Sequence, residues 1–401
     1  MTSPKLRFKE FGGCWENTSF QSLFTFKNGI NASKEQYGSG TKFINVLDII
    51  NNPNGITYDS IIGSVQVFQK DIDKNLVNYG DVVFQRSSET REEVGQSNVY
   101  LSKEPVVFGG FVIRGSARVP YDPLFMNGLL KTDKVRDQIT QLSGGSTRFN
   151  IGQDSLNKVS VFLPSKEEQT KIASFLSNVD EKISQLSQKH QLLSQYKQGM
   201  MQKLFSQQIR FKADDGSEFG EWEEKKLGEI SKTFSGGTPQ SSNKSFYEGT
   251  IPFIKSGEIS KNTTEQCIND LALEKSSAKL VKKGDLLYAL YGATSGQVAI
   301  SQIDGAINQA VLCIRSELNT KYLLNFLLLK KEEILTTYLQ GGQGNLSASI
   351  LKEIYIPTPC LKEQTKIANF LSAIDQKIEV VAQQIEQAKQ WKKGLLQQMF
   401  V

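Results

Sequence analysis

Histidine is almost absent from this chain: His190 is the one histidine among 401 residues. A Ser/His/Asp triad or a Cys/His pair cannot be built without it. His190 lies in an apolar heptad repeat, so we expect it to have a structural role. The four cysteines are far apart and form no Cys-x-x-Cys pair. This spacing argues against a structural zinc site and is typical of a protein from a reducing cytoplasm.

Motifs for nucleotide binding and for methyl transfer are also missing. Gly292-Ala-Thr-Ser-Gly296 is followed by Gln297 rather than by lysine, so it is not a P-loop. Phe108-Gly-Gly-Phe111 lacks the glycine spacing of a dinucleotide fingerprint. Asn52-Pro53-Asn54 differs from the Asn-Pro-Pro-aromatic segment of amino-methylating enzymes. We expect adjacent acids such as Glu92-Glu93 on a solvated surface, and therefore predict no catalytic residue and no metal site.

Long apolar runs are absent too. No stretch of about 18 apolar residues could form a transmembrane helix, and residues 1–10 lack the apolar core of a secretory signal. We therefore expect a cytoplasmic protein without a membrane partner. The net charge of +5 is spread along the chain without a polybasic tail, so the fold would have to assemble any surface for nucleic acid.

The chain does contain a long internal repeat. Residues 168–205 and 363–400 are identical at 18 of 38 positions, and neither segment contains proline. In both, apolar residues recur at alternating steps of three and four, which is the heptad pattern of a coiled coil. Each helix would be roughly 57 Å long at about 1.5 Å per residue. Because one seam cannot bury itself, we expect the two helices to pack together.

Lys197 and Lys392 occupy equivalent places on this seam. We expect their aliphatic stems to be buried and their ammonium groups to reach solvent. The alternative is that they fix the register of the helix pair or meet an acidic partner.

The duplication extends beyond the helices. Gly80-Asp81, followed by an apolar run, parallels Gly284-Asp285, and Val112-Ile113-Arg114 parallels Cys313-Ile314-Arg315. Each Gly-Asp predicts a turn that enters a strand. In each module a helical pattern follows, over residues 125–142 and 322–339, and ends before a glycine pair.

These patterns predict an α+β chain with two similar α/β modules and two long helices. The expected order is a first module over 1–163, a long helix over 164–208, a second module over 209–358 that begins with a linker over 209–221, and a second long helix over 359–401.

Polar loops occur at matching places in the two modules. Residues 85–91 and 291–297 follow the Gly-Asp strands, and residues 146–150 and 343–345 follow the module helices. Arginine reads guanine, asparagine and glutamine read adenine, and hydroxyl groups bind phosphates. Each loop alone could be ordinary polar surface, but divergent loops on one repeated scaffold favour different ligand specificities. The residues that we expect to bind DNA are Lys42, Arg86, Ser87, Ser88, Thr90, Arg91, Arg148 and Asn150 in the first module, and Thr238, Lys244, Lys255, Tyr291, Thr294, Ser295, Gln297, Gln343 and Asn345 in the second.

The repeated segments resemble a known family. The motif Pro-x3-Glu-Gln-x2-Ile-x2-Phe-Leu occurs over residues 164–176 and 359–371, and the second module also has Gly236-Gly-Thr-Pro239. With these motifs and the two Gly-Asp turns, nearly the whole chain resembles a specificity subunit of a type I restriction–modification system. The first module departs from the family pattern, with Lys27-Asn28-Gly29-Ile30 where Gly-Gly-Thr-Pro is expected.

This resemblance implies a DNA-reading subunit without catalysis of its own. Each module would be a target recognition domain that reads one half of a split, asymmetric site in double-stranded DNA. The long helices would pack antiparallel, give the chain a pseudo-two-fold internal repeat, space the two domains and bind two methyltransferase subunits. Those partners would carry S-adenosylmethionine, and restriction subunits would add ATP- and Mg-dependent translocation and cleavage. No cofactor is expected in this chain.

Two other functions stay open at this point. The first is a coiled-coil assembly scaffold whose modules bind protein without reading DNA. Such a scaffold is expected to expose apolar patches, whereas a DNA reader should cluster its basic groups. The second is a stand-alone enzyme, which the missing motifs disfavour.

Overall fold

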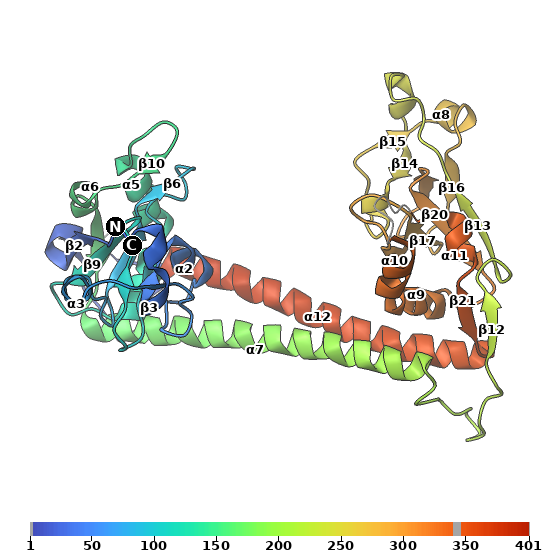
Figure 1. The fold of residues 1–401 in the computed structure, drawn as a ribbon, viewed down its shortest axis with the longest axis horizontal. Helices are drawn as coiled ribbons and strands as arrows, with labels where there is room; N and C mark the ends of the chain where they lie inside the picture. The colour runs from blue at the N-terminus through green and yellow to red at the C-terminus, as the bar shows by residue number, and fades with distance from the viewer. Residues whose placement is uncertain (1–2, 340–345, 401) are drawn as a thin grey trace. The chain divides into compact units, whose positions relative to one another are not determined.

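The computed structural model describes residues 3–339 and 346–400, and the chain divides into two compact units. Unit 1 comprises residues 1–186 and 383–401, and unit 2 comprises residues 187–382. Each unit therefore contains one module and one part of each long helix (Figure 1).

The module of unit 1 is built from short strands and short helices. Its strands are β1 (Glu16–Ser19), β2 (Phe24–Asn28), β3 (Tyr37–Ile44), β4 (Ser64–Val65), β5 (Val82–Gln85), β6 (Ser87–Ser88), β7 (Ser97–Val99), β8 (Val107–Phe108), β9 (Val112–Ala117), β10 (Phe149–Asn150) and β11 (Ser160–Leu163). Its helices are α1 (Phe20–Leu23), α2 (Val46–Asn51), α3 (Gln69–Lys74), α4 (Pro123–Leu129), α5 (Asp133–Leu142) and α6 (Gln153–Asn157), with a 3-10 turn η1 (Lys34–Gln36).

The module of unit 2 has a closely similar series of elements. Its strands are β12 (Glu223–Lys226), β13 (Ser231–Ser235), β14 (Ile251–Ile254), β15 (Cys267–Ile268), β16 (Lys279–Val281), β17 (Leu286–Ala289), β18 (Val298–Ile300), β19 (Gly305–Ile307), β20 (Val311–Ser316) and β21 (Tyr355–Thr358). Its helices are α8 (Asp270–Glu274), α9 (Thr320–Leu329), α10 (Lys331–Leu339) and α11 (Ala348–Lys352), with 3-10 turns η2 (Lys244–Tyr247) and η3 (Ser256–Glu258).

The strand order confirms the predicted duplication. A four-stranded antiparallel sheet has the order β2-β9-β5-β7 in unit 1 and β13-β20-β17-β18 in unit 2. A second sheet has the order β4-β3-β8 in unit 1 and β15-β14-β19-β16 in unit 2, with one parallel pair in each, β3 with β8 and β14 with β19. The pairs β1-β11 and β12-β21 join the first and last strands of each module. The α+β class is therefore confirmed for both modules.

Strands β5 and β17 are buried on both faces, which explains why their sequences are continuous apolar runs. Val82 and Phe84 pack into one apolar cluster of unit 1, whereas Val83 between them packs into another. Leu286 and Leu287 are divided in the same way between two clusters of unit 2. Because side chains alternate along a strand, each sheet separates two parts of its module's core.

The two Gly-Asp turns form as predicted. Gly80 and Gly284 have φ angles of 88° and 97°, a conformation that favours glycine. The next residue closes the turn, because a carboxylate oxygen of Asp81 or Asp285 accepts a hydrogen bond from a backbone N–H three residues earlier, at 2.9 and 2.8 Å. These aspartates thus serve the fold rather than a ligand.

An arginine from the neighbouring strand faces each aspartate. The alignment predicted from the sequence, which matched Arg114 to Arg315, is wrong by two residues. The sheet pairs Val83 with Arg114 and Leu287 with Cys313, so Arg114 corresponds to Cys313 rather than to Arg315. Both arginines still reach the turn, because residues two apart on a strand share a face.

The two arginine contacts differ in strength. Arg315 donates to both carboxylate oxygens of Asp285 at 3.0 and 2.6 Å, whereas Arg114 Nε lies 3.8 Å from Asp81. Burial raises the pKa of Asp81, and its backbone hydrogen bond and Arg114 only partly oppose this. Burial also acts to raise the pKa of Asp285, but the hydrogen bonds from Arg315 and from the backbone outweigh it, so that pKa is lowered.

The helical pattern over residues 125–142 forms two helices instead of the single one predicted. Thr132 has an extended backbone, with φ −68° and ψ 148°, and precedes α5 as its N-cap residue. Helix α5 ends at Leu142, before Gly144, as predicted. In unit 2 the corresponding pattern is divided between α9 and α10, and its glycine pair lies outside the described residues.

The long helices are α7 (Lys166–Phe205) and α12 (Leu361–Met399). In unit 1, Ile172, Leu176 and Val179 of α7 share a buried cluster with Leu395 and Met399 of α12. In unit 2, Met201 and Leu204 of α7 share one with Ile367, Leu371 and Ile374 of α12. In each unit the start of one helix packs against the end of the other, so the pairing is antiparallel and uses the predicted seam.

The seam lysines form ion pairs with the opposite helix. Lys197 Nζ lies 2.7 Å from a carboxylate oxygen of Asp375 in unit 2, and Lys392 Nζ lies 2.5 Å from Asp180 in unit 1. The residue numbers of the partners have the same sum in both pairs, so the two pairs define the same antiparallel register. Of the alternatives for these lysines, fixing the register therefore agrees with the structure.

We call the segment around Arg7 the strap of the first module, and the segment that contains Arg210 and Trp222 the strap of the second. The glutamate of the repeated Glu-Gln motif anchors each strap. Glu168 is buried and accepts hydrogen bonds from Arg7 Nε and Nη2, both at 2.7 Å. Glu363 is buried and accepts from Arg210 Nε at 3.1 Å and Nη2 at 2.8 Å, and from the indole N–H of Trp222 at 2.9 Å. The segment predicted to be a linker thus includes a residue that is fixed to the start of α12.

The glutamine of the same motif anchors a module helix. The side-chain carbonyl of Gln169 accepts a hydrogen bond from the N–H of Asp122 at 2.9 Å, and that of Gln364 accepts from the N–H of Asn319 at 2.8 Å. Asp122 and Asn319 are the N-cap residues of α4 and α9. The motif is therefore repeated because each long helix holds its strap and its module in the same way.

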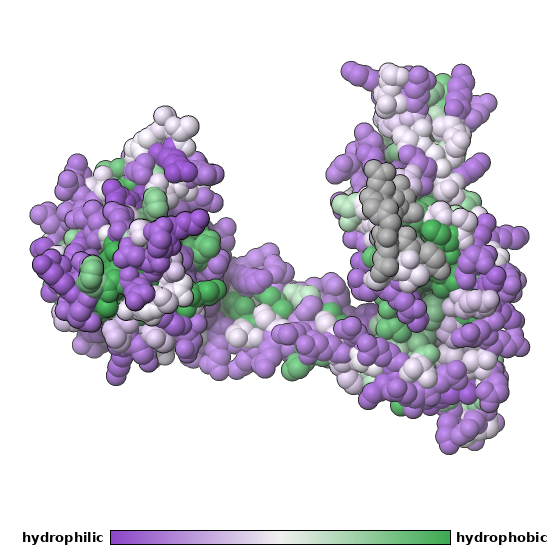
Figure 2. All heavy atoms as spheres, in the orientation of Figure 1, coloured by the Kyte–Doolittle hydropathy of each residue, from purple (hydrophilic) through white to green (hydrophobic). Residues whose placement is uncertain are grey.

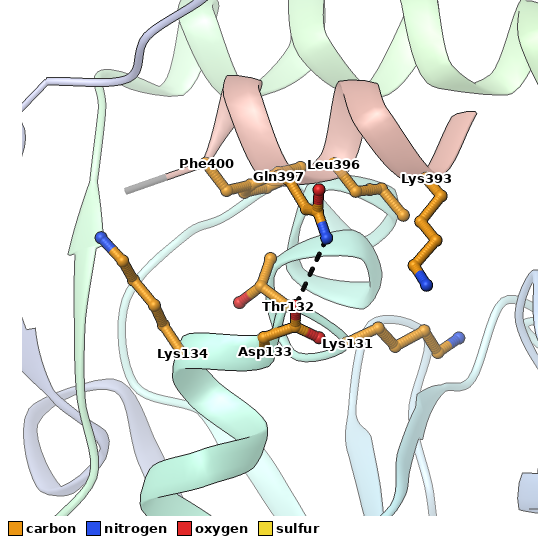
Figure 3. Close-up of a pocket in the computed structure, with 8 residues that line it drawn as sticks. All are labelled: Lys131, Thr132, Asp133, Lys134, Lys393, Leu396, Gln397 and Phe400. Carbon is orange, nitrogen blue, oxygen red and sulfur yellow. Dashed lines mark hydrogen bonds between the residues drawn. The ribbon is translucent and has the colours of Figure 1, made fainter. Parts of the chain in front are cut away.

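The end of α12 packs on the module of unit 1 beside a cavity of about 360 Å³ (Figure 3). The rings of Phe400 and Phe125 are 5.1 Å apart, and Gln397 approaches Asp133 at 3.5 Å. Burial lowers the pKa of Lys131, at the edge of this cavity, to about 8, and the charge of Lys392 acts in the same direction. Lys131 donates to the carbonyl groups of Pro53 and Asn127, so it joins parts of the module rather than facing a free ligand site.

Candidate nucleic-acid interface

The two polar loops of the first module lie together, although the sequence relates each of them only to its counterpart in the other module. Strands β6 and β10 pair Ser87 with Asn150 and Ser88 with Phe149. Arg86, which precedes β6, is exposed, and its guanidinium lies 3.4 Å from the carbonyl oxygen of Gly110. Arg148 on the other loop is exposed too. Two exposed arginines therefore flank a short ladder in which Ser87 pairs with Asn150 and Ser88 with Phe149.

Other residues predicted in the first module have structural contacts. Ser88 is buried and donates to Glu93 at 2.8 Å, and the Thr90 N–H donates back to Ser88 Oγ at 3.3 Å. Arg91 donates to a backbone carbonyl of α5 at 3.1 Å. The Lys42 ammonium donates to two backbone carbonyls at 2.9 Å and lies 4.6 Å from the centre of the Tyr58 ring. Of the set predicted in the first module, Arg86, Thr90, Arg91, Arg148 and Asn150 are exposed, whereas Ser88 is buried.

In the second module, three predicted residues from different segments line one cavity. Thr238, Lys244 and Lys255 surround a volume of about 360 Å³ on the side of β14. The remaining lining residues are Ser241, Tyr247, Phe253, Gln266 and Asn308. This cavity has two lysines, several hydrogen-bonding groups and no carboxylate, so it suits the phosphates and base edges of nucleic acid.

A chain of side chains links this cavity to the loop after β17. Thr238 Oγ1 lies 2.7 Å from Gln309 Oε1, and Gln309 also interacts with Tyr291. Burial raises the pKa of Tyr291, and its hydrogen bond with Gln309 acts in the opposite direction. Tyr291 therefore stays protonated near neutral pH and can donate a hydrogen bond. The loop residue Thr294 lies near Gly257, in the η3 turn that follows Lys255.

The other predicted residues of the second module have different positions. Ser295 is half-buried and donates to the carbonyl of Leu290 at 3.0 Å, whereas Gln297 is exposed. Gln343 and Asn345 lie outside the described residues.

Sequence reasoning missed Gln309, Asn308 and Gln266, which belong to this site. Asn308 and Gln309 lie between β19 and β20, in a stretch without glycine or proline. A pair of amide side chains between two apolar runs is the signal that could have identified them.

Hydrogen-bond registers show which segment of the first module corresponds to Gly236-Gly-Thr-Pro239. The sheet pairs Phe26 with Gly115 and Thr233 with Ile314, which makes Gly29 the counterpart of Gly236. An added Cβ would lie 2.2 Å from a backbone oxygen at Gly29 and 1.7 Å at Gly236, so both places require glycine. The segment that takes the family motif's place is thus Gly29-Ile-Asn-Ala32 rather than the predicted Lys27–Ile30.

Residues 3–339 and 346–400 contain no group of three or more His, Cys, Asp or Glu side chains placed to hold a metal ion. No helix within the same residues is long and apolar enough to cross a membrane.

Comparison with known proteins decides the family. The chain matches the type I restriction modification DNA specificity domain twice, over residues 14–195 and 220–390. The chain belongs to this family. Each match thus covers most of one module and most of the long helix that follows it, in agreement with the repeat seen in the strand order.

Relatives in this specificity family match over much of the chain. The putative type I restriction enzyme MjaX specificity subunit of Methanocaldococcus jannaschii is 26% identical over 398 residues, which cover 95% of this chain and 92% of that protein. The EcoR124I/EcoR124II specificity subunit of Escherichia coli is 27% identical over 168 residues, or 39% of this chain and 41% of that protein.

Chains in solved structures of type I restriction–modification systems have the same fold. The type I restriction–modification S subunit from M. genitalium has a TM-score of 0.58 at 18% identity, covering 100% of this chain and 99% of that one. A chain from a structure of a type I R-M system has a TM-score of 0.64 at 17% identity, covering 95% and 96%. The resemblance and the fold class predicted from the sequence are confirmed.

Proposed function

We propose that this chain is the DNA-specificity subunit of a type I restriction–modification complex, and that each module reads one half of a split, asymmetric site. The observation that carries the proposal is the repeated specificity domain, whose two copies present different side chains from the same fold. Arg86 and Arg148 serve the first half-site. Tyr291, Thr294, Gln343 and Asn345 serve the second, together with the lysines of the adjoining cavity.

Single substitutions should therefore distinguish residues that read a base from residues that bind phosphate. Arg86→Ala should cost about 1–3 kcal/mol if the guanidinium reads a base, and should relax one position of the first half-site. Lys244→Ala should weaken binding to all sequences alike if the ammonium group contacts phosphate, and should reduce the salt dependence. The measurement is affinity for duplexes that carry every single base change.

Arg118 offers a matched control, because it is an exposed arginine of the first module that donates to Thr25 instead. Arg118→Ala should leave both half-sites unchanged. An Arg86→Ala variant that loses discrimination in the second half-site would contradict the assignment.

The long helices are proposed to bind two methyltransferase subunits. Support comes from the sequence, because the helices are the part kept most alike in the two repeats, as two identical partners would require. The methyltransferase subunits would carry S-adenosylmethionine and methylate adenine. Restriction subunits would add ATP and Mg²⁺. No catalytic step is assigned to this chain. Exposed apolar side chains of the first module, such as Ile62 and Phe111, fit the alternative of a scaffold that binds protein, but the repeated specificity domain favours DNA readout.

Charge reversal on the helices should weaken this assembly. Lys182 and Lys377 are exposed on α7 and α12. The double variant Lys182→Glu, Lys377→Glu should co-purify less methyltransferase, while the free chain keeps its unfolding midpoint. Assembly that survives deletion of both helices would exclude them as the binding surface.

A further inference from the structure

The first module has an open apolar groove of about 600 Å³ where its two sheets meet the loop before β9. Ile30, Phe43, Leu47, Ile62 and Phe111 contribute apolar side chains to its walls. Three of these are strongly exposed: Ile62 at 94%, Phe111 at 67% and Leu47 at 63%. Figure 2 shows hydrophobic residues at the surface of unit 1 between hydrophilic ones. Several large apolar side chains around one hollow favour a binding surface.

This groove occupies the same place in the repeated fold as the polar cavity of the second module. Phe43 pairs with Val107 in the parallel β3-β8 ladder, and Phe253 pairs with Ala306 in the β14-β19 ladder. Both phenylalanines line their hollows. The loop between β8 and β9 contributes Gly109–Phe111 to one hollow, and the corresponding loop between β19 and β20 contributes Asn308 to the other. The two hollows are therefore counterparts with different linings.

The groove also adjoins the arginine assigned to the first half-site. The Arg86 N–H donates to the carbonyl of Phe111 at 2.8 Å, and the Arg86 guanidinium lies 3.4 Å from the carbonyl of Gly110. Asn31 packs against Gly110 from the other side, at the place that Thr238 takes in the second module. Apolar and hydrogen-bonding groups therefore lie side by side at the edge of the groove.

We infer that this groove reads thymine through its 5-methyl group, an inference that rests on the proposed function. The methyl group of thymine is the apolar group that B-DNA displays at a base edge in the major groove. The apolar groove would take the methyl group of the thymine, and the adjacent arginine would bind a neighbouring phosphate or guanine. In the second module, Thr238 takes the place of Asn31, and Lys244 and Lys255 also line the cavity, so that half-site is read by charge and hydrogen bonds.

The test compares thymine with deoxyuridine, which lacks only the methyl group. The full chain with its methyltransferase partner is titrated with duplexes of the methylated motif, in which each thymine in turn is replaced by deoxyuridine. Burial of one methyl group is worth roughly a fourfold change in affinity. We expect a loss of about this size for at least one thymine of the first half-site, and no change for thymines of the second.

Variants connect the effect to the groove. Ile62→Ala with Phe111→Ala should weaken binding of the thymine duplex and remove the difference between thymine and deoxyuridine, as a double-mutant cycle would show. Phe68→Ala is the matched control, because Phe68 is 80% exposed in the same module but does not line the groove. It should bind like the unmodified chain.

Three results would overturn the inference. They are a first half-site without thymine in either strand, no loss with deoxyuridine there, or a loss that persists in the Ile62, Phe111 double variant. If that double variant instead loses methyltransferase and keeps the thymine effect, the groove binds protein. Failure of the proposed function is distinct, because the complex would then bind its motif no better than a scrambled duplex.

Discussion

Replacing Glu363 with alanine should lower the free energy of unfolding of unit 2 by about 3 kcal/mol. The carboxylate is fully buried and accepts three hydrogen bonds, two from Arg210 and one from Trp222. Alanine would leave a guanidinium and an indole N–H without their acceptor, and both groups belong to the strap that precedes the second module. Arg210 is 25% exposed, so water can replace part of the lost contact. Hydrogen exchange in increasing urea measures the loss for residues 187–382 separately.

Two other variants calibrate this value. Glu168→Ala should cost about 1 kcal/mol less, because Glu168 accepts from Arg7 but from no indole group. Glu386→Ala breaks an exposed pair with Lys389 and should change stability by less than about 0.5 kcal/mol. Equal effects for Glu363 and Glu386 would contradict the anchoring role of the motif.

Inserting one heptad into each long helix should widen the unread gap of the methylated motif by about three base pairs. Seven residues preserve the seam and add roughly 10 Å of helix, against about 3.4 Å per base pair. The ion pairs of Lys197 with Asp375 and of Lys392 with Asp180 give the matching level, so an insertion after Leu186 is paired with one before Glu386. The bases of the two half-sites should not change, because the recognition loops are untouched.

Some loss of affinity is expected in this variant. Three base pairs rotate one half-site by about 100°, since a helical turn of DNA is about 10 base pairs. The control is a heptad inserted in α7 alone, which breaks the register and should abolish assembly. A paired insertion that is active with an unchanged gap would show that the helices do not set the spacing.

The long helices could be predicted from the sequence because a heptad repeat is a local pattern. Their antiparallel pairing was implied by the resemblance, and contacts such as Lys197 with Asp375 supply its register. The role of the Glu-Gln motif could not be predicted, because Arg7 and Glu168 are 161 residues apart and meet only in the fold. Repetition identified the motif as important without indicating its contacts.

The candidate site was predictable in part, because its loops follow strand and helix patterns that are local in the sequence. Within the first module, β6 and β10 join the loop predicted after the Gly-Asp strand to the loop predicted after the module helix. Asn31 and Gln309 were missed because they lie in connections between strands. Only the pairing of those strands brings them to the hollows of the two modules. Short strands offer few residues to align, which explains the two-residue error between Arg114 and Arg315.

The central claim is that two differently lined modules read the two halves of one DNA site. It is tested most directly by mapping methylated adenines in cells that express this chain with its methyltransferase partner, beside cells that express Arg86→Ala. The claim predicts a split motif with a fixed gap, and in the variant a relaxed first half with an unchanged second half. A single continuous motif, or one that changes in both halves, would contradict it.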